Sequence, residues 1–320
     1  MFNKSVKAVS IILVCSALII FVFAGPAKAV FPEKPIRIIV GSAAGGGDDT
    51  ESRAIAVYLE KYMKVRVIIE NQPGAGGKIA FEKFMTTKPD GYSLLASSFP
   101  RGPIIETMEK VNFRVKDYTP VYAWSRTNSL LVVSADTWKT MDEFVAAAKT
   151  RILSGGLSGR GSTTHLSGLI AMEALKLKVN WVPFEGASGS VTALAGKHLD
   201  FTICLTASAI PLIQSGKLRP LILFGDQRDP FLPDVPIPKD LGYKIESLPA
   251  TRGVHAPPNT PASIVKILDD GFNQAVKDPG FIEWGKNRKM VPFNLTGRQF
   301  EKVVTEAYPT VEKFKQLLKE

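Results

Sequence analysis

Hydrophobic positions along the chain form short β-branched runs that alternate with longer segments of helical periodicity. Residues 36–40 are a run of the kind buried in a parallel sheet, and Ile55 and Leu59 have the spacing of a helix face. The same pattern predicts further strands at residues 65–70, 92–97, 130–133, 181–190, 199–205 and 218–224. Helices are predicted at residues 141–149, 163–175 and 297–318. Further helices are predicted through Phe84, around Leu194 and, initiated by the proline-rich residues 257–261, through Phe272. This alternation is typical of an α/β fold with mostly parallel sheets.

A glycine loop follows the first predicted strand. Gly45, Gly46 and Gly47 allow a tight turn, and Asp48 or Asp49 is expected to cap the next helix. A helix that begins directly after such a turn presents free N–H groups, which bind anions through hydrogen bonds and the helix dipole. The loop is therefore a candidate anion site. The alternative is a tight turn that binds nothing.

A second glycine loop, residues 71–77, follows the second predicted strand. Both loops are expected at the carboxyl edge of the sheet, where open α/β sheets bind ligands. The known nucleotide motifs do not fit. The dinucleotide pattern requires glycine where Thr50 stands, and the phosphate loop requires Ser or Thr where Ile79 follows Gly77 and Lys78.

Residues 1–29 have the pattern of a signal peptide. Lys4 and Lys7 precede an uncharged apolar stretch, and an Ala-x-Ala cleavage site ends at Ala29. The expected mature protein is exported to the periplasm.

Cleavage would remove three lysines and no acid, so the formal charge would fall from +10 to +7. The basic residues are scattered, which argues against a nucleic-acid partner. Cys204 alone would remain, so no disulfide or cysteine metal site is expected.

An ordered set of motifs resembles one protein family. The motifs are residues 31–37 (FPEKPIR), 45–53 (GGGDDTESR), 70–77 (ENQPGAGG), 88–92 (KPDGY), 159–166 (GRGSTTHL), 182–186 (VPFEG), 232–236 (LPDVP) and 256–261 (APPNTP). No single motif is specific, but the set in this order is similar to the extracytoplasmic solute-binding proteins of tripartite tricarboxylate transporters, the Bug receptors.

The resemblance implies a two-domain periplasmic-binding-protein fold, type II-like, with two crossover segments and a ligand cleft between the domains. Residues 30–127 plus 250–320 would form domain 1, and residues 128–249 domain 2. It also implies a monomer without cofactors that captures a small organic carboxylate or amino-acid-like ligand and serves a membrane transporter or a sensor kinase. The implied ligand-binding residues are Ser42, Ala43, Gly45, Gly46, Gly47, Asp48, Asp49, Ala75, Gly76, Gly77, Ser162, Thr163, Thr164, His165, Phe184, Gly186 and Ser188.

The chain departs from the pattern of the family at one short segment and two single positions. Residues 41–44 are Gly-Ser-Ala-Ala where Pro-Phe-Ala-Pro is usual, Asp48 stands where Thr or Ser is usual, and Glu185 where Lys is usual. If both carboxylates face the cleft, they would favour a ligand that also carries a positive group, because like charges repel a plain dicarboxylate. Otherwise they cap helices or face solvent.

An exported hydrolase that uses Ser162 and His165 is the competing hypothesis. These residues lie three apart at a predicted helix start, and Cys204 is a possible nucleophile. Residues 186–190 miss the nucleophile-elbow pattern because Ser190 replaces the final glycine. No two histidines have metal-ligand spacing. For His165, a structural hydrogen bond at the helix start and ligand contact are both expected roles, and Cys204 is expected to be a buried small residue.

Overall fold

The structure is a computed structural model that describes residues 31–290 and 292–319, so the signal-peptide prediction lies outside the described residues. Residues Lys34–Glu320 form one unit. Its strands are β1 (Ile36–Val40), β2 (Val67–Asn71), β3 (Ser93–Phe99), β4 (Thr119–Thr127), β5 (Ser129–Ser134), β6 (Leu153–Leu157), β7 (Val179–Pro183), β8 (Phe201–Leu205), β9 (Leu218–Phe224), β10 (Ala250–Ala256) and β11 (Pro292–Thr296).

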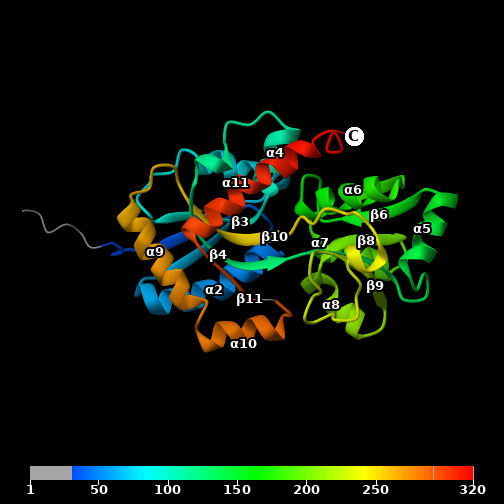
Figure 1. Ribbon diagram of the computed structural model, residues 1–320. Coiled ribbons are helices and arrows are strands. Elements are labelled where there is room, and N and C mark those ends of the chain that lie inside the picture. The colour runs from blue at the N-terminus through cyan, green and yellow to red at the C-terminus, as the bar shows by residue number, and fades with distance from the viewer. Residues whose placement is uncertain (1–30, 291, 320) are drawn as a thin grey trace, which may run out of the picture. The chain divides into compact units, whose positions relative to one another are not determined.

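Helices alternate with strands along most of the chain, except that β5 follows β4 directly and α10 follows α9 (Figure 1). They are α2 (Gly47–Met63), α3 (Lys78–Phe84), α4 (Arg101–Met108), α5 (Met141–Thr150), α6 (Thr163–Leu175), α7 (Ala187–Ala195), α8 (Thr206–Gln214), α9 (Ala262–Ala275), α10 (Pro279–Asn287) and α11 (Gly297–Lys313), with short 3-10 turns η1 (Ala75–Gly77), η2 (Val115–Asp117) and η3 (Pro238–Leu241).

The strands form two sheets, as expected for a two-domain α/β fold. One has the order β11-β4-β10-β3-β1-β2 and the other β7-β6-β8-β5-β9. The expectation of mostly parallel sheets is wrong, because both sheets are mixed. β1 pairs parallel with β2 and β3, and β6 with β7 and β8, but β4, β10, β11, β5 and β9 pair antiparallel. These five strands are not joined to their neighbours by a strand–helix–strand unit, which is the connection that makes a pair parallel.

Strand β5 explains why the second sheet is covered on both faces. Leu131 and Val133 belong to a buried cluster with α5 and α6, whereas Leu130 and Val132 belong to a cluster with α7 and α8. Successive residues of a strand point to opposite faces, so an unbroken apolar run needs helices on both sides. That covering places the N-termini of these helices beyond the strand ends.

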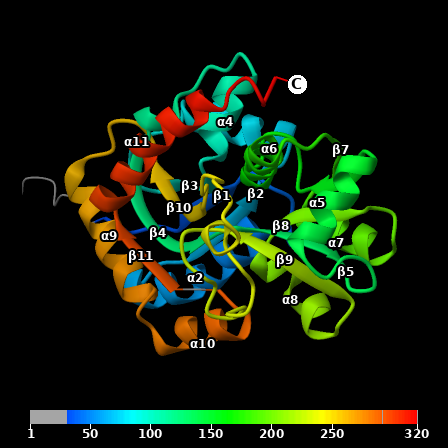
Figure 2. The same cartoon turned by 45° about the vertical axis from the view of Figure 1, so that its right-hand side comes forward.

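The first sheet is covered in the same way. Ala123 of β4 lies in a cluster with residues of α3, α4 and α11, whereas Tyr122 and Trp124 stack on Phe272 of α9. Helix α9 packs on α2, which completes that face. Figure 2 shows α11 and α4 on one side of this sheet and α2 and α10 on the other.

The chain passes from one sheet to the other at residue 128, between β4 and β5, and returns in residues 225–249, between β9 and β10. One buried cluster joins the two parts, because Ile104 of α4 and Val311 of α11 pack with Leu131 and Phe201 of the second sheet.

Several local predictions need correction. The strand predicted at residues 181–190 ends at Pro183, and the serines beyond it belong to α7, whose apolar Val191 and Leu194 fall one helical turn apart and face the core. The aspartates do not cap α2, because its N-cap is Gly46 and both carboxylates bond elsewhere. The sequence pattern did not predict strands β4, β6, β10 and β11 or helices α4, α8 and α10.

Candidate functional site

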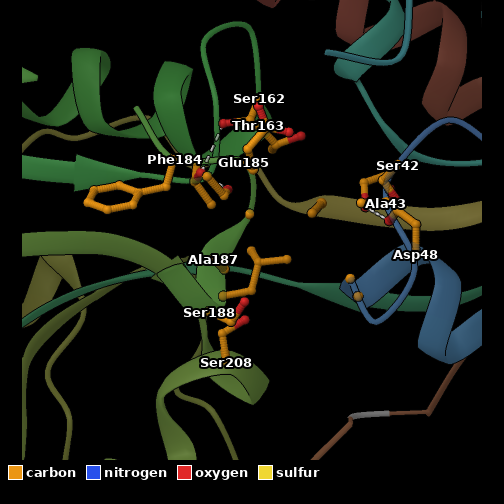
Figure 3. A pocket seen from close by; sticks show the side chains of 18 of the residues that line it. Ser42, Ala43, Asp48, Ser162, Thr163, Phe184, Glu185, Ala187, Ser188 and Ser208 are labelled. Carbon is orange, nitrogen blue, oxygen red and sulfur yellow. Dashed lines mark hydrogen bonds between the residues drawn. The ribbon is translucent and has the colours of Figure 1, made fainter. Parts of the chain in front are cut away.

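The N-termini of four helices line one cavity of about 600 Å³. Helix α2 contributes Gly46, Gly47 and Asp48, and the second sheet contributes the starts of α6, α7 and α8. The lining residues are Ser42, Ala43, Ala44, Gly45, Gly46, Gly47, Asp48, Ser98, Arg101, Ser158, Ser162, Thr163, Thr164, Phe184, Glu185, Gly186, Ala187, Ser188, Gly189, Leu205, Ser208, Ala250 and Arg252. Figure 3 shows Ser42, Ala43 and Asp48 across this cavity from Ser162, Thr163 and Ser188.

The N-terminus of α2 is free to bind an anion. Its N-cap Gly46 makes no side-chain cap, and the first N–H groups of a helix have no carbonyl partner inside the helix. Asp49 does not fill this role, because its carboxylate accepts from the N–H of Gly45 at 2.8 Å and pairs with Arg53 at 2.9 Å. Burial alone would raise the pKa of Asp49, but the bonds from Arg53 and Gly45 lower it. Asp49 therefore holds the loop in shape.

The two glycine loops lie against each other. A Cβ on Gly77 would be 3.2 Å from the carbonyl oxygen of Gly41, and Gly77 has φ of +103°, so glycine is required by both space and backbone. The amide of Asn71 donates to the carbonyl of Ser42 at 3.0 Å and accepts from Arg53 at 2.9 Å. This network fixes the first loop relative to the second.

Residues Ala75, Gly76 and Gly77 line a second cavity of about 580 Å³ rather than the first. Six residues border both cavities: Ser42, Ala43, Arg101, Ser158, Phe184 and Glu185. The predicted binding residues of the two loops are thus brought to adjoining cavities with a shared wall.

On the opposite side, Ser162 caps α6 by accepting from the N–H of His165 at 3.1 Å, and its hydroxyl also bonds to Thr164 at 3.0 Å. The hydroxyl of Thr163 is buried without a hydrogen-bond partner in the described residues. Helices α7 and α8 have N-caps Gly186 and Leu205, neither of which makes a side-chain cap. Three helix starts therefore direct N–H groups or hydroxyls toward the cavity.

Asp48 belongs to a buried ionic cluster that sequence analysis missed. Its carboxylate accepts from Arg252 Nε at 2.8 Å and from the hydroxyl of Ser98 at 2.5 Å. Arg252 also pairs with Glu51, which accepts in turn from Ser125 at 2.5 Å. Burial by itself would raise the pKa of Asp48, but the positive charges of Arg252 and then Arg101 lower it. Asp48 borders the cavity as an ionised, paired carboxylate.

Arg252 is ionised in this cluster. Burial acts to lower the pKa of its guanidinium, but the carboxylates of Glu51 and Asp48 raise it above its usual value. A Cβ on Gly47 would be 2.5 Å from an Arg252 nitrogen, so the guanidinium lies directly beside the start of α2. The cavity is therefore lined by arginine side chains as well as by backbone amides.

His165 lies away from both cavities. It borders a separate cavity of about 710 Å³ that also includes Trp181. Its Nδ1 accepts from the N–H of Gly161 at 3.2 Å, and burial, followed by the charge of Arg160, lowers its pKa to about 4. Of its two expected roles, the structure shows the hydrogen-bonded helix start.

The other candidates for catalysis also have structural roles. Ser162 bonds to the backbone of His165 and not to its ring, and Cys204 is buried in β8, where burial raises its thiol pKa to about 12. Within the described residues, no cluster of three or more His, Cys, Asp or Glu side chains is arranged to hold a metal ion.

Of the predicted set, Ser42, Ala43, Gly45, Gly46, Gly47, Asp48, Ser162, Thr163, Thr164, Phe184, Gly186 and Ser188 border the first cavity. Sequence analysis did not select Ser98, near the end of β3, or Arg101, just after it. Both lie at the same sheet edge, so the strand-end rule was a usable signal for them. No such signal marked Ser208, at the start of the unpredicted helix α8, or Arg252, on the antiparallel strand β10.

Comparison with known proteins identifies the family. Residues 52–320 match the sequence model described as "Tripartite tricarboxylate transporter family receptor". The chain belongs to this family. It is 34% identical over 296 residues to the "UPF0065 protein in gbd 5'region" of Cupriavidus necator, with 90% of this chain and 88% of that protein covered.

Solved structures agree with this family. The chain is similar to the "Structure of periplasmic binding protein BugD", with 26% identity, a TM-score of 0.81, and 90% of this chain and 98% of that chain covered. It is also similar to "MatC (Rpa3494) from Rhodopseudomonas palustris with bound malate", with 26% identity, a TM-score of 0.80, and 89% and 100% of the two chains covered. The tripartite tricarboxylate transporter receptor described here is thus a periplasmic solute-binding protein and not an enzyme. In its described residues, no helix is long and apolar enough to cross a membrane.

Proposed function

We propose that this receptor binds a small organic carboxylate in the first cavity and delivers it to a membrane transporter. The observation that carries the proposal is the meeting of four helix N-termini, those of α2, α6, α7 and α8, at one cavity. Each contributes partial positive charge and N–H donors, which stabilise an anion without a full counter-charge. The malate in the similar MatC structure supports the same ligand class.

The carboxylate is expected to bind against the start of α2. The N–H groups of Gly47 and Asp48 are the primary donors, and the hydroxyls of Ser42, Thr163 and Ser188 complete the set. The hydroxyls of Ser42 and Thr163 are buried with no partner in the described part of the chain, so a ligand oxygen would supply the missing hydrogen bonds.

The competing ligand class is an amino acid or a similar zwitterion. The carboxylate of Asp48 does not favour a zwitterionic ligand, because Arg252 and Arg101 balance its negative charge. Glu185 does favour a ligand with a positive group, because this side chain is exposed, borders both cavities and has no ion-pair partner in the described residues. We favour the carboxylate without an amino group because one flexible, exposed acid repels an anion only weakly in water.

The remaining organisation is proposed from the same family. Residues 1–29 would be removed on export, residues 30–127 plus 250–320 would form domain 1, and residues 128–249 domain 2. The exported receptor would act as a monomer, and a sensor kinase is a second possible recipient of the loaded form. The passages between sheets at residues 128 and 225–249 support these boundaries.

The test is thermal unfolding with pairs of probes that share a skeleton and differ only in charge. Succinate and butyrate are compared with succinamide and butyramide. Binding to the native state stabilises it by about 2.7 kcal/mol at a ligand concentration of 100 times Kd. We expect the carboxylates to raise Tm and to be recovered unchanged, while the amides do not raise it. Equal shifts with the amides, or turnover of a bound probe, would refute the proposal.

A further inference from the structure

We propose that Arg101 is a specificity-determining residue that binds a second carboxylate of the ligand, so that this receptor prefers dicarboxylates to monocarboxylates. This inference rests on the proposed function and extends it, because it assigns the first carboxylate to the start of α2 and the second to a guanidinium. Arg101 belongs to neither glycine loop and to none of the starts of α2, α6, α7 and α8.

Arg101 lies where the two cavities meet. It is the first residue of α4, directly after β3 and Pro100, and it borders both cavities. A Cβ on Gly77 would be 3.8 Å from Arg101 Cδ, and Nη1 of Arg101 is 3.7 Å from Asp48 Oδ2. The side chain therefore runs from the second glycine loop to the start of α2, beside the proposed site of the first carboxylate.

The guanidinium of Arg101 has unused hydrogen-bonding capacity. Its side chain is only 16% exposed, and in the described residues it makes no hydrogen bond. Its ionic contact with Asp48, at 3.7 Å, is too long for a hydrogen bond. A guanidinium carries five N–H donors in a planar fork, and leaving them unpaired in a largely buried position is unfavourable. A carboxylate that binds two of these donors in parallel would satisfy them.

The neighbouring charges explain why Arg101 is the free member of its cluster. Two carboxylates, Asp48 and Glu51, balance two guanidiniums, Arg252 and Arg101, so the cluster carries no net formal charge. Asp48 directs its short bonds to Arg252 and Ser98, and Glu51 bonds to Arg252, so carboxylates hold Nε and Nη1 of Arg252, whereas the side chain of Arg101 makes no hydrogen bond in the described residues. Among these two arginines, Arg101 therefore has its whole guanidinium fork available for an additional carboxylate, whereas Arg252 has mainly Nη2, beside Gly47, left to donate.

The test compares matched dicarboxylates and monocarboxylates, because only the former carry the second group. Binding isotherms are measured for succinate against butyrate, glutarate against pentanoate, and adipate against hexanoate, with the native receptor and Arg101→Gln. We expect the variant to bind the preferred dicarboxylate about 10- to 100-fold more weakly, since it loses a charge-assisted pair, and to bind its monocarboxylate partner about as well as before.

Two further variants keep the test decisive. Arg66→Gln removes the same charge from a side chain that is 81% exposed and borders neither cavity, and it should leave both affinities within about twofold. Arg101→Lys keeps the charge but not the fork, and should give an intermediate loss for the dicarboxylate alone. If the melting curve of Arg101→Gln without ligand shows that this variant is misfolded, Arg101→Lys takes its place in the comparison.

The outcomes separate this inference from the function on which it rests. Equal losses for both members of a pair, no loss, or a native preference for monocarboxylates would overturn the role of Arg101 and leave the carboxylate receptor intact. If the native protein binds neither member of any pair, both the proposed function and this inference are wrong.

Discussion

At the scale of single residues, the position of Asp48 is decided by a partner 204 positions away in the chain. The sequence showed that Asp48 departs from the family, and left open whether it faces the cleft. Its actual environment depends on Arg252, which reaches it because β10 pairs with β3 in the middle of the first sheet. No local pattern around either residue reports such a contact, so only the fold could reveal it.

The buried cluster gives a stability prediction. Arg252→Met should lower the free energy of unfolding by about 3–5 kcal/mol, because Asp48 and Glu51 would stay buried without their main counter-charge. The control Arg37→Met removes an arginine that is 53% exposed and pairs with Glu70 at 3.6 Å, and should cost less than about 1 kcal/mol. Urea denaturation at pH 7 measures both. Similar losses in the two variants would show that the cluster is not effectively buried.

His255 predicts a dependence of stability on pH. It is fully buried against Phe300, neither ring nitrogen has a partner in the described residues, and burial lowers its pKa to about 3. Between pH 6.5 and 3, the unfolded chain therefore binds a proton that the native protein does not bind. The free energy of unfolding falls as the pH falls through this window, by about 1.4 kcal/mol per unit from this residue.

His255→Leu should remove this contribution, so the stability of the variant should decline less steeply than that of the native protein between pH 6 and about pH 4. The measurement is urea denaturation at several pH values. His198→Leu, at an exposed position, should retain the native slope. If His255→Leu also keeps the native slope, the ring is hydrated or otherwise charged in the folded state.

At the scale of elements, the alternation of apolar runs located every parallel strand except β6, and most of the helices. Helix α6 and strand β9 begin and end where the pattern placed them. Strand β6 was missed because its sequence, Leu-Ser-Gly-Gly-Leu, lacks β-branched residues. A glycine is needed for packing at position 155, because a Cβ there would be 2.5 Å from Phe201. The antiparallel pairing of β4 and β10 has no signature in a single sequence, because pairing direction is set by the path of the whole chain.

The start of α2 gives a prediction about binding. Gly46→Val should weaken carboxylate binding by at least about 10-fold, because its methyl groups would obstruct the approach of an anion to the helix N–H groups. The backbone at Gly46, with φ of −69° and ψ of 167°, is open to valine, and a Cβ there would lie 3.2 Å from the carbonyl oxygen of Ala43, a tight contact within the loop, so the fold outside the loop should be kept. Titration calorimetry with succinate measures the loss.

Val57→Ala is the control for this variant, because Val57 is on the same helix with 64% of its surface exposed. It should bind succinate like the native protein. Full affinity in Gly46→Val would place the carboxylate away from the start of α2.

At the scale of the whole molecule, the two sheets and the passages between them fit a receptor that encloses its ligand. The motifs identified this architecture, but no single motif reports which loops face each other. The cavity joins helix starts from residues 46 to 208, which are distant in sequence, and the shared cluster of Ile104, Val311 and Leu131 keeps the two parts in contact on one side. Domain closure on a bound ligand would then require hinge changes near residues 128 and 248.

The most direct test of the central claim is a crystal structure of the receptor with the preferred dicarboxylate bound. We predict that one carboxylate lies within about 3.2 Å of the backbone nitrogens at the start of α2, with Gly47 and Asp48 as donors, and that the other carboxylate pairs with Arg101. Density for the ligand in another cavity, such as the one beside Trp181 and His165, or in this cavity with neither carboxylate on the α2 amides, would contradict the account.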